Sequence, residues 1–97
     1  MPIPFTSRVN TAPDVMLRVI GEEAVILNLN NELYLGLDPV GTRMWLVLHS
    51  APSIQAAYEL LLAEFEVEPE RLRRDLDKLL DQMLEQGLIE LQPVEAA

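Results

Sequence analysis

The chain has 97 residues, 16 acidic and 7 basic side chains, and a formal net charge of −9. This length predicts one domain, and a hydrophobic fraction of 49% excludes a chain that is disordered as a whole. The negative charge disfavours nucleic acid and anionic lipid as partners, and no apolar run approaches the roughly 18 residues of a membrane span.

Residues 1–14 contain Pro2, Pro4 and Pro13 and have no hydrophobic periodicity, so we expect an extended N-terminal arm. The beginning of the chain lacks the basic and then apolar layout of a secretory signal. The chain also has no cysteine, which excludes a disulfide framework. We therefore expect a cytoplasmic protein.

Residues 15–37 are rich in Val, Ile and Leu and are interrupted at two turn-like points. The sequence Gly21-Glu22-Glu23 separates 15–20 from 24–29, and Asn30-Asn31 separates 24–29 from 32–37. Asparagine tolerates positive φ, so Asn30-Asn31 can form a tight two-residue turn. The pattern predicts a three-stranded antiparallel sheet.

A two-residue turn at Asn30-Asn31 fixes the pairing of the second and third strands. Leu29 then lies opposite Glu32, Leu27 opposite Tyr34, and Ile26 opposite Leu35. Paired residues share a face of the sheet. One face carries Val25, Leu27, Leu29 and Tyr34, and the other carries Ile26, Leu33, Leu35 and Leu37. Both faces are apolar, so we expect one to cover the helices and the other to meet the N-terminal arm or a second chain.

Three helices are predicted after the sheet. Asp38 as N-cap and Pro39 in the first position begin a helix over 39–48. Ser53 caps the second helix, whose apolar stripe extends to Phe65. The third spans 69–86, followed by Gly87 at the position of a C-cap glycine. Residues 88–91 are expected to pack back or form one more strand.

The order of three strands and then three helices predicts an α+β, winged helix-turn-helix-like fold. We place this domain at residues 15–91, between the arm (1–14) and a C-terminal tail (92–97).

Catalysis has little support in the sequence. His49, the single histidine, lies beside Ser50 without an acidic neighbour to complete a triad. A solvent-exposed histidine at a helix C-terminus, where its charge favours the helix dipole, is the better interpretation. The chain also lacks a phosphate-binding glycine loop and a spaced set of metal ligands. We expect no enzyme activity, no metal and no cofactor.

Basic residues gather on one side of the third helix. Arg71, Arg74 and Lys78 fall within roughly 60° of one another, with Asp75 alongside, next to an apolar stripe. Two interpretations are open: ordinary amphipathicity, with long side chains covering the core, or the basic rim of a groove beside a sheet edge. DNA binding is a less supported interpretation, because residues 66–86 hold seven acidic residues against the four bases Arg71, Arg73, Arg74 and Lys78.

The third strand, 32–37, has no proline and only one charged residue, which is weak protection for a sheet edge. An extended peptide could add to it as a further strand, with side-chain pockets giving specificity. Alternatively, the arm, the tail or a second copy of the chain covers this edge.

A family resemblance rests on an ordered set of segments within residues 14–91. The set comprises the run 24–29 with its turn, the stretch YLGLDPVGTRMW at 34–45, the apolar helix 53–65, the sequence Val67-Glu68-Pro69-Glu70 and the ending Gln86-Gly87-Leu88-Ile89. In this order the chain resembles PqqD-like proteins, which include coenzyme PQQ synthesis protein D and the stand-alone recognition proteins of lasso-peptide pathways. The run 36–41 favours the stand-alone type.

The resemblance implies a recognition element for precursor peptides made by ribosomes. The leader segment of the precursor would add as a strand to 32–37, beside helix 69–86. A radical SAM enzyme or a leader peptidase would then act on the peptide. The positions carried over to the peptide site are Leu33, Tyr34, Leu35, Arg71, Arg74, Asp75 and Lys78. Two other interpretations stay open: a winged-helix DNA-binding regulator, and a dimerising structural subunit. A homodimer is compatible with each of them.

Overall fold

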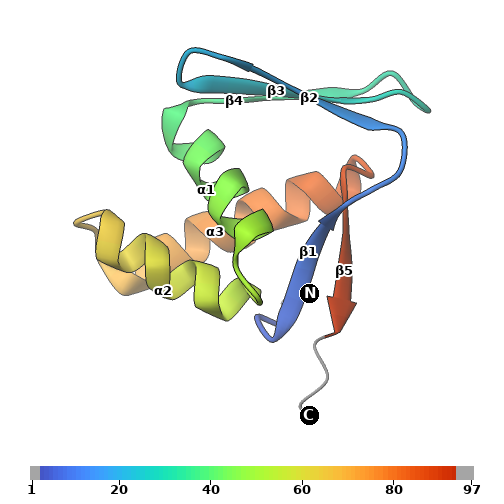
Figure 1. The fold of residues 1–97 in the computed structure, drawn as a ribbon. Coiled ribbons are helices and arrows are strands. Elements are labelled where there is room, and N and C mark those ends of the chain that lie inside the picture. Colours follow the sequence, from blue (N-terminus) through green and yellow to red (C-terminus); the bar gives the residue numbers. More distant parts are fainter. Residues whose placement is uncertain (1–2, 94–97) are drawn as a thin grey trace.

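The structure, a computed structural model, describes residues 3–93 (Figure 1). Its elements follow in chain order as β1 (Ser7–Thr11), β2 (Val15–Ile20), β3 (Glu23–Asn28), β4 (Tyr34–Leu37), α1 (Pro39–Ser50), α2 (Ile54–Glu64), α3 (Pro69–Glu85) and β5 (Ile89–Pro93). One sheet has the order β2-β3-β4, and β1 and β5 form a second, two-stranded sheet. The predicted α+β class and the three-stranded sheet that precedes the helices are confirmed.

The predicted register of β3 and β4 is confirmed, because Leu27 pairs with Tyr34 and Ile26 pairs with Leu35. The predicted two-residue turn is wrong. The Asn28 amide donates to the Leu33 carbonyl (2.8 Å) and the Glu32 amide donates to the Asn28 carbonyl (2.9 Å), so the loop spans 29–32. Lengthening a hairpin loop by one residue on each side preserves the register. Strand β4 consequently begins at Tyr34, later than expected.

The two faces of the β2-β3-β4 sheet differ in burial. Ala24, Ile26 and Leu37 are buried on the inner face, which packs against the helices. In Figure 1 the sheet lies above α1 and α3. Ile20, Val25 and Tyr34 are exposed on the outer face, and no described segment covers them. The N-terminal segment therefore does not meet this face, contrary to one expectation.

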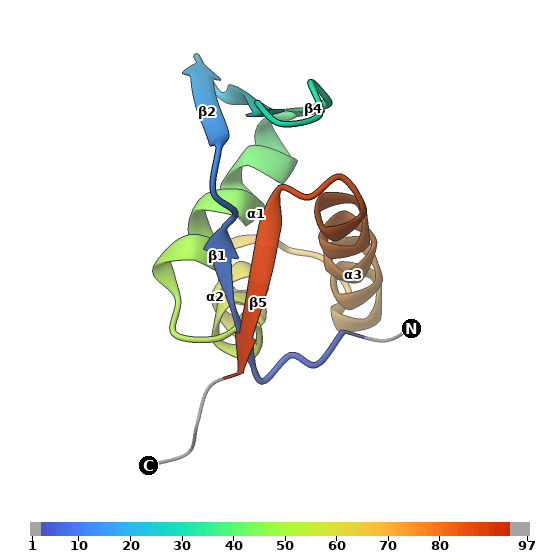
Figure 2. The same cartoon turned by 90° about the vertical axis from the view of Figure 1, so that its right-hand side faces the viewer.

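The N-terminal segment belongs to the core instead. Strand β1 pairs with β5 in antiparallel register, with Val9 opposite Leu91, and Figure 2 shows the two strands side by side. Ile3, Phe5 and Val9 are buried. The segment is extended, as predicted, but it is not an arm outside the domain that begins at residue 15. Of the predicted tail, Gln92 and Pro93 complete β5, and residues 94–97 lie outside the described part of the chain.

Local signals fix the helix ends. Asp38 caps α1, since its Oδ1 accepts from the Gly41 amide (2.7 Å), and Ser53 caps α2 by accepting from the Ala56 amide (3.1 Å). Helix α1 runs to Ser50, slightly beyond the predicted end. Gly87 has φ of +70°, as a C-cap glycine requires.

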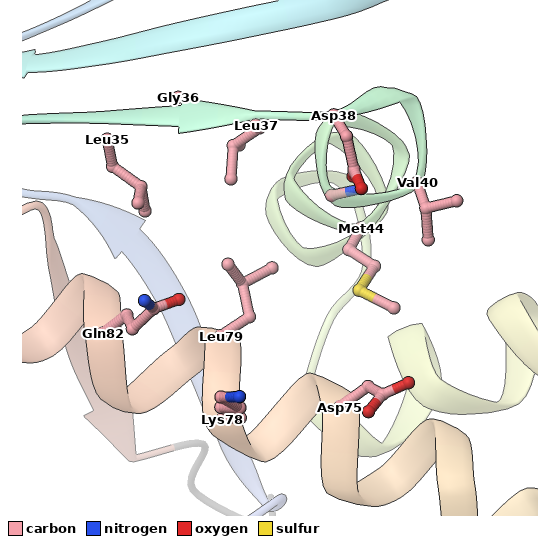
Figure 3. A pocket seen from close by; sticks show the side chains of 11 residues that line it. Leu35, Gly36, Leu37, Asp38, Val40, Met44, Asp75, Lys78, Leu79 and Gln82 are labelled. Atoms are coloured by element: carbon pink, nitrogen blue, oxygen red, sulfur yellow. The ribbon is translucent and has the colours of Figure 1, made fainter.

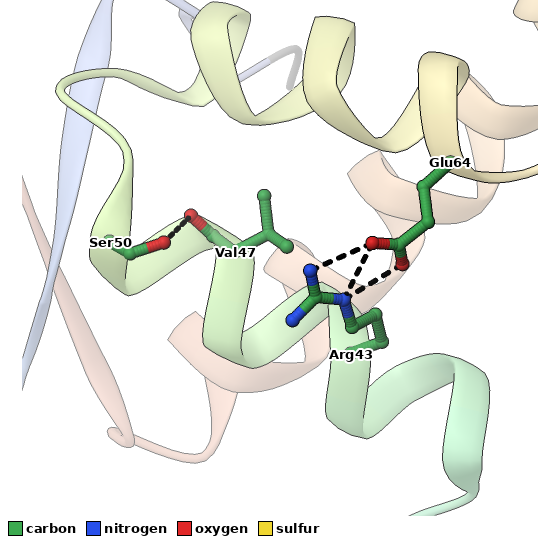
Figure 4. A network of polar contacts seen from close by, with 4 residues as sticks. All are labelled: Arg43, Val47, Ser50 and Glu64. Atoms are coloured by element: carbon green, nitrogen blue, oxygen red, sulfur yellow. Dashed lines mark hydrogen bonds and ion pairs between the residues drawn. The ribbon is translucent and has the colours of Figure 1, made fainter.

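Helices α1 and α2 are joined at the surface by an ion pair (Figure 4). The Arg43 Nε donates to both carboxylate oxygens of Glu64 (2.8 Å each), and a terminal guanidinium nitrogen lies 2.7 Å from Oε1. The pairing raises the pKa of Arg43 and lowers the pKa of Glu64. Beneath this pair, α1 and α2 pack through the buried side chains of Leu48, Ile54 and Leu61.

His49 is half-buried, which corrects the expectation of a solvent-exposed side chain. Its ring lies against Trp45, with 4.1 Å between the ring centroids. Nδ1 lies 2.9 Å from the Trp45 carbonyl and Nε2 lies 2.9 Å from the Thr11 hydroxyl. Because a carbonyl only accepts, Nδ1 carries the proton in the neutral ring and Nε2 accepts from Thr11. Burial lowers the pKa of His49. The hydrogen bond with Thr11 joins α1 to the end of β1.

Candidate functional site

Strand β4 is an edge of its sheet, because it pairs with β3 alone. The hydrogen bond from Asn28 to the Leu33 carbonyl fixes which backbone groups face β3. In an antiparallel ladder this direction alternates along the strand, so residue 35 also faces β3. The N–H and C=O groups of Tyr34 and Gly36 therefore point away from the sheet. They form a row to which an extended chain can bind.

An open cleft of about 410 Å³ lies between β4 and α3. Its walls come from β4, the beginning of α1 and one side of α3: Leu35, Gly36, Leu37, Asp38, Val40, Gly41, Met44, Asp75, Lys78, Leu79 and Gln82. Figure 3 shows Leu35 and Leu37 directed down from β4 and Leu79 directed up from α3. The cleft thus has an apolar interior below a free strand edge.

Polar groups are distributed unevenly along the cleft. Figure 3 places Gln82 below Leu35, Lys78 near the middle, and Asp75 towards Met44 at the α1 end. The Asp38 carboxylate is already engaged in capping α1. Lys78 is the one cation among the lining residues. It can pair with an acidic group that enters the middle of the cleft.

Three of the sequence-predicted site residues, Leu35, Asp75 and Lys78, meet in this cleft. Tyr34 lies on the free edge with its side chain exposed on the outer face. Leu33 directly precedes β4, at the end of the 29–32 loop, and its backbone amide donates to the Asn31 side chain (2.9 Å).

Arg71 lines an adjoining hollow of about 230 Å³, which shares Val40, Met44 and Asp75 with the cleft. Its Nε lies 3.9 Å from the carboxylate of Asp75. On this side of α3, Asp75 and Lys78 line the cleft and Arg71 lines the hollow beside it.

Arg74 is not part of the cleft. It lines a separate hollow with Ile3, Phe5 and Asp77. The reason is helical geometry: Arg74 and Asp75 differ by about 100° around α3, and Asp75 faces the cleft. The three bases share a broad sector of the helix, but β4 lies over only one side of it.

Sequence reasoning did not identify Met44, Leu79 and Gln82 as site residues. In the sequence, Met44 and Leu79 lie among apolar residues at helical spacing, a pattern typical of core residues. Gln82 follows Lys78 by four positions, so it lies one turn further along the same face of α3. That spacing was available as a signal.

Asn28 ties the sheet to the end of α3. Its side chain is buried, and its Nδ2 donates to the carbonyls of Gln86 (3.0 Å) and Gly87 (3.2 Å). Its Oδ1 accepts from the Asn30 amide (2.9 Å). These contacts set the separation of β3 and α3 at one end of the cleft, while the direct connection from β4 to α1 sets the other.

The fold and the site define a winged helix-turn-helix-like α+β domain with one open strand edge above an apolar cleft. The family model described as coenzyme PQQ synthesis protein D (PqqD) matches residues 23–89, more than half of the chain. The chain therefore belongs to the PqqD family.

Two solved structures are similar over most of the chain. "TbiB1 in Complex with the TbiA(beta) Leader Peptide" has a TM-score of 0.77 and 30% identity, covering 84% of this chain and 94% of that one. "Lasso peptide synthetase B1 complexed with the leader peptide" has a TM-score of 0.76 and 20% identity, covering 86% and 98%. The second similarity concerns the fold alone. No curated protein matches the chain at a significant level.

Within residues 3–93, no helix is both long and apolar enough to cross a membrane. Across the same described residues, no three His, Asp or Glu side chains gather as a metal site would require.

Proposed function

We propose that this chain is a non-catalytic, cytoplasmic recognition protein for a precursor peptide made by the ribosome. It binds the leader segment as an added strand on β4, beside α3, and presents the peptide to a modifying enzyme such as a radical SAM enzyme or a leader peptidase. The observation that carries the proposal is the free edge of β4 directly above an apolar cleft. The leader-peptide complex of the similar protein with 30% identity supports it.

The backbone contribution follows from the direction of the β4 groups. Tyr34 and Gly36 each offer one N–H and one C=O to an added strand. Each hydrogen bond contributes about 1 kcal/mol net, because it replaces a bond to water. Such bonds are independent of sequence, so they supply affinity without specificity.

Specificity comes from alternate side chains of the peptide. Residues opposite Leu35 and Leu37 share the inner face and enter the cleft. Residues opposite Tyr34 and Gly36 lie on the outer face. Each apolar side chain that becomes buried contributes about 1.5–3 kcal/mol. Ordering the peptide offsets part of this gain, which leaves dissociation constants in the range of about micromolar to nanomolar.

A DNA-binding function has less support. Of the four bases on α3, Arg73 lies over the Phe5 ring (4.1 Å to the centroid) and Arg71 lies near Asp75. The same helix carries the acids Glu70, Asp75, Asp77, Asp81 and Glu85. A helix with this charge distribution would bring carboxylates towards phosphates. Binding dominated by phosphate contacts would also fall steeply with salt, whereas strand addition would change little.

The testing experiment is an NMR titration of labelled protein. The probes are the leader of a precursor encoded beside this chain's gene and, separately, the TbiA(beta) leader peptide. We expect shifts concentrated in residues 34–37 and 75–82. No shifts with either peptide, at concentrations up to about 1 mM, would refute the proposal for these leaders.

Gly36 offers a matched pair of variants for the mode of binding. Gly36→Ala keeps the outward N–H, and a Cβ there meets nothing within 4 Å, so binding should persist. Gly36→Pro removes that N–H without removing a bond to β3, and should weaken binding at least about tenfold. Equal affinities for the two variants would show that the peptide does not add to β4 as a strand.

A further inference from the structure

Strand β2 forms the second edge of the sheet and is unusually unprotected. Every residue of β2 except Arg18 is apolar, and all but Val15 are classed as exposed. The exposed fractions of Leu17, Val19 and Ile20 are 37%, 53% and 71%. Figure 2 shows β2 on the side of the sheet away from α3, so this edge is separate from the peptide cleft.

The outward backbone groups of β2 can be assigned. The Leu29 amide donates to the Asp14 carbonyl (2.8 Å), and alternation places the bonds from β2 to β3 at even-numbered residues. The N–H and C=O groups of Val15, Leu17 and Val19 therefore point away from the sheet. Pairing with β3 is one-to-one along the whole strand, without a bulge. The usual protections of an edge, namely proline, lysine or a bulge, are all missing from β2.

Both faces of β2 border hollows with largely apolar walls, although Glu22 and Arg43 also line the inner hollow. On the outer face, a hollow of about 200 Å³ is lined by Met16, Arg18, Ile20, Val25 and Leu27. On the inner side, a hollow of about 270 Å³ lies between Val19 of β2 and Leu46 of α1. An occupant of this edge must therefore be an extended strand with apolar side chains on both of its faces. The sequence of β2 itself meets this description.

We propose that β2 pairs with β2 of a second copy of this chain, antiparallel about a two-fold axis at Leu17. Hydrogen bonds require outward groups on both strands, so odd-numbered residues pair with odd-numbered residues. Centred on Leu17, the axis places Leu17 opposite Leu17, Val15 opposite Val19, and Met16 opposite Arg18. Each of the residues 15–19 then lies opposite a residue of the same range in the second copy.

Charge decides between this register and its nearest competitor. An axis at Arg18 would set the two guanidinium groups directly opposite each other, which is destabilising. With the axis at Leu17, Arg18 lies opposite Met16 of the second copy, so the two Arg18 side chains are diagonal neighbours and no longer directly opposed. Each Arg18 is also diagonal to Asp14 of the second copy, which carries the opposite charge. An axis at Met16 would place Arg18 opposite Asp14 but Val19 opposite Pro13, which has no N–H to donate. Axes at Val15 or Val19 would likewise pair β2 with Pro13 or with the turn at Gly21. In such a two-fold contact both copies use the same edge, so no β2 edge remains free and assembly stops at a dimer.

The dimer joins the two three-stranded sheets into one continuous sheet. Its outer edges are the two β4 strands, so both peptide clefts remain open. This inference does not depend on the proposed peptide binding.

Light scattering after size-exclusion chromatography tests the assembly. We expect twice the monomer mass of 11.0 kDa for the unaltered chain. Leu17→Lys should give a folded monomer, because two ammonium groups would face each other across the axis. Tyr34→Lys, an exposed position on the opposite edge, should remain dimeric. A monomer for the unaltered chain at about 1 mM would overturn the proposal, as would a dimer for Leu17→Lys.

Single cysteines test the register, since the chain has no cysteine of its own. Leu17→Cys should be joined efficiently by a short bifunctional thiol reagent, because paired Cα atoms lie about 5.5 Å apart. Val19→Cys should not, since Val19 is offset from its counterpart by four residues, about 13 Å along the strand. Preferential linking at Val19→Cys, or at Tyr34→Cys, would overturn the proposed pairing. The proposed pairing would also be overturned if the chain formed no dimer and the modifying enzyme covered β2 instead.

Discussion

Substitution of Asn28 tests whether the tie between β3 and the end of α3 holds the molecule together. Asn28→Ala removes the donors to the Gln86 and Gly87 carbonyls and the acceptor of the Asn30 amide. Each bond contributes about 0.5–1.5 kcal/mol net, and partners left unsatisfied in a buried place add to the cost. We expect a loss of about 2–4 kcal/mol, a large part of the roughly 5–15 kcal/mol that stabilises a small domain.

Urea denaturation measures this loss. With a slope of about 2 kcal/mol per molar urea, the midpoint should fall by about 1–2 M. Asn30→Ala is the matched control, because that side chain is exposed and its one contact, to Asp14, is long (3.3 Å). The control should change stability by less than about 0.5 kcal/mol.

An isosteric variant separates hydrogen bonding from packing. Asn28→Asp keeps the shape and the acceptor but sets a carboxylate against two carbonyl oxygens at the C-terminal end of α3. It should be less stable than Asn28→Ala at pH 7. This environment raises the pKa of the introduced carboxyl, so the deficit should shrink as the pH falls and the group becomes protonated. Equal stability of the alanine variant and the unaltered chain would refute the reasoning, because water would then satisfy the freed groups.

Three other predictions concern the cleft, the histidine and the end of α3. Lys78→Glu should weaken binding of an acidic leader about fivefold or more in a fluorescence titration, whereas Arg74→Glu, with the same charge change outside the cleft, should leave it within about twofold. Because burial lowers the pKa of His49, its contribution to stability is complete above the unfolded-state value near 6.5 and is lost as the pH falls through the lower folded value. Denaturation midpoints between pH 7.5 and 5 should show this dependence in the unaltered chain and not in His49→Gln. Gly87→Ala should cost about 1–2 kcal/mol in the same assay, because φ is +70° and the new Cβ would lie 3.1 Å from the side-chain nitrogen Nδ2 of Asn28.

Local signals in the sequence were sufficient for much of the fold. Asp38-Pro39, Ser53 and Gly87 marked the helix ends because capping depends on a few neighbouring residues. The register of β3 and β4 was also predictable, although the turn was not. A two-residue and a four-residue loop share the same symmetric pairing, so an error in loop length left Leu27 opposite Tyr34.

The features that sequence reasoning missed depend on distant parts of the chain. The pairing of β1 with β5 joins residues near the two ends of the chain. In the sequence, the prolines within residues 1–14 concealed the short alternating pattern of Ser7, Val9 and Thr11. The burial of His49 follows from that pairing, because β1 brings Thr11 to its ring. For the site, the helical spacing of Arg71, Arg74 and Lys78 was correct, but the position of β4 over α3 decided which of them reach the cleft.

The two edges of the same sheet differ in what lies beneath them, and this difference separates their proposed roles. Below β4, the cleft combines apolar side chains with Lys78 and Gln82, so it can select a sequence while the edge supplies backbone bonds. Beside β2, the two hollows have largely apolar walls, with Arg18 lining the outer hollow and Glu22 and Arg43 lining the inner one. An edge of that kind selects for shape and register, which a self-complementary strand satisfies. Blocking β4 should therefore abolish peptide binding without altering the mass of the assembly, and blocking β2 should do the reverse.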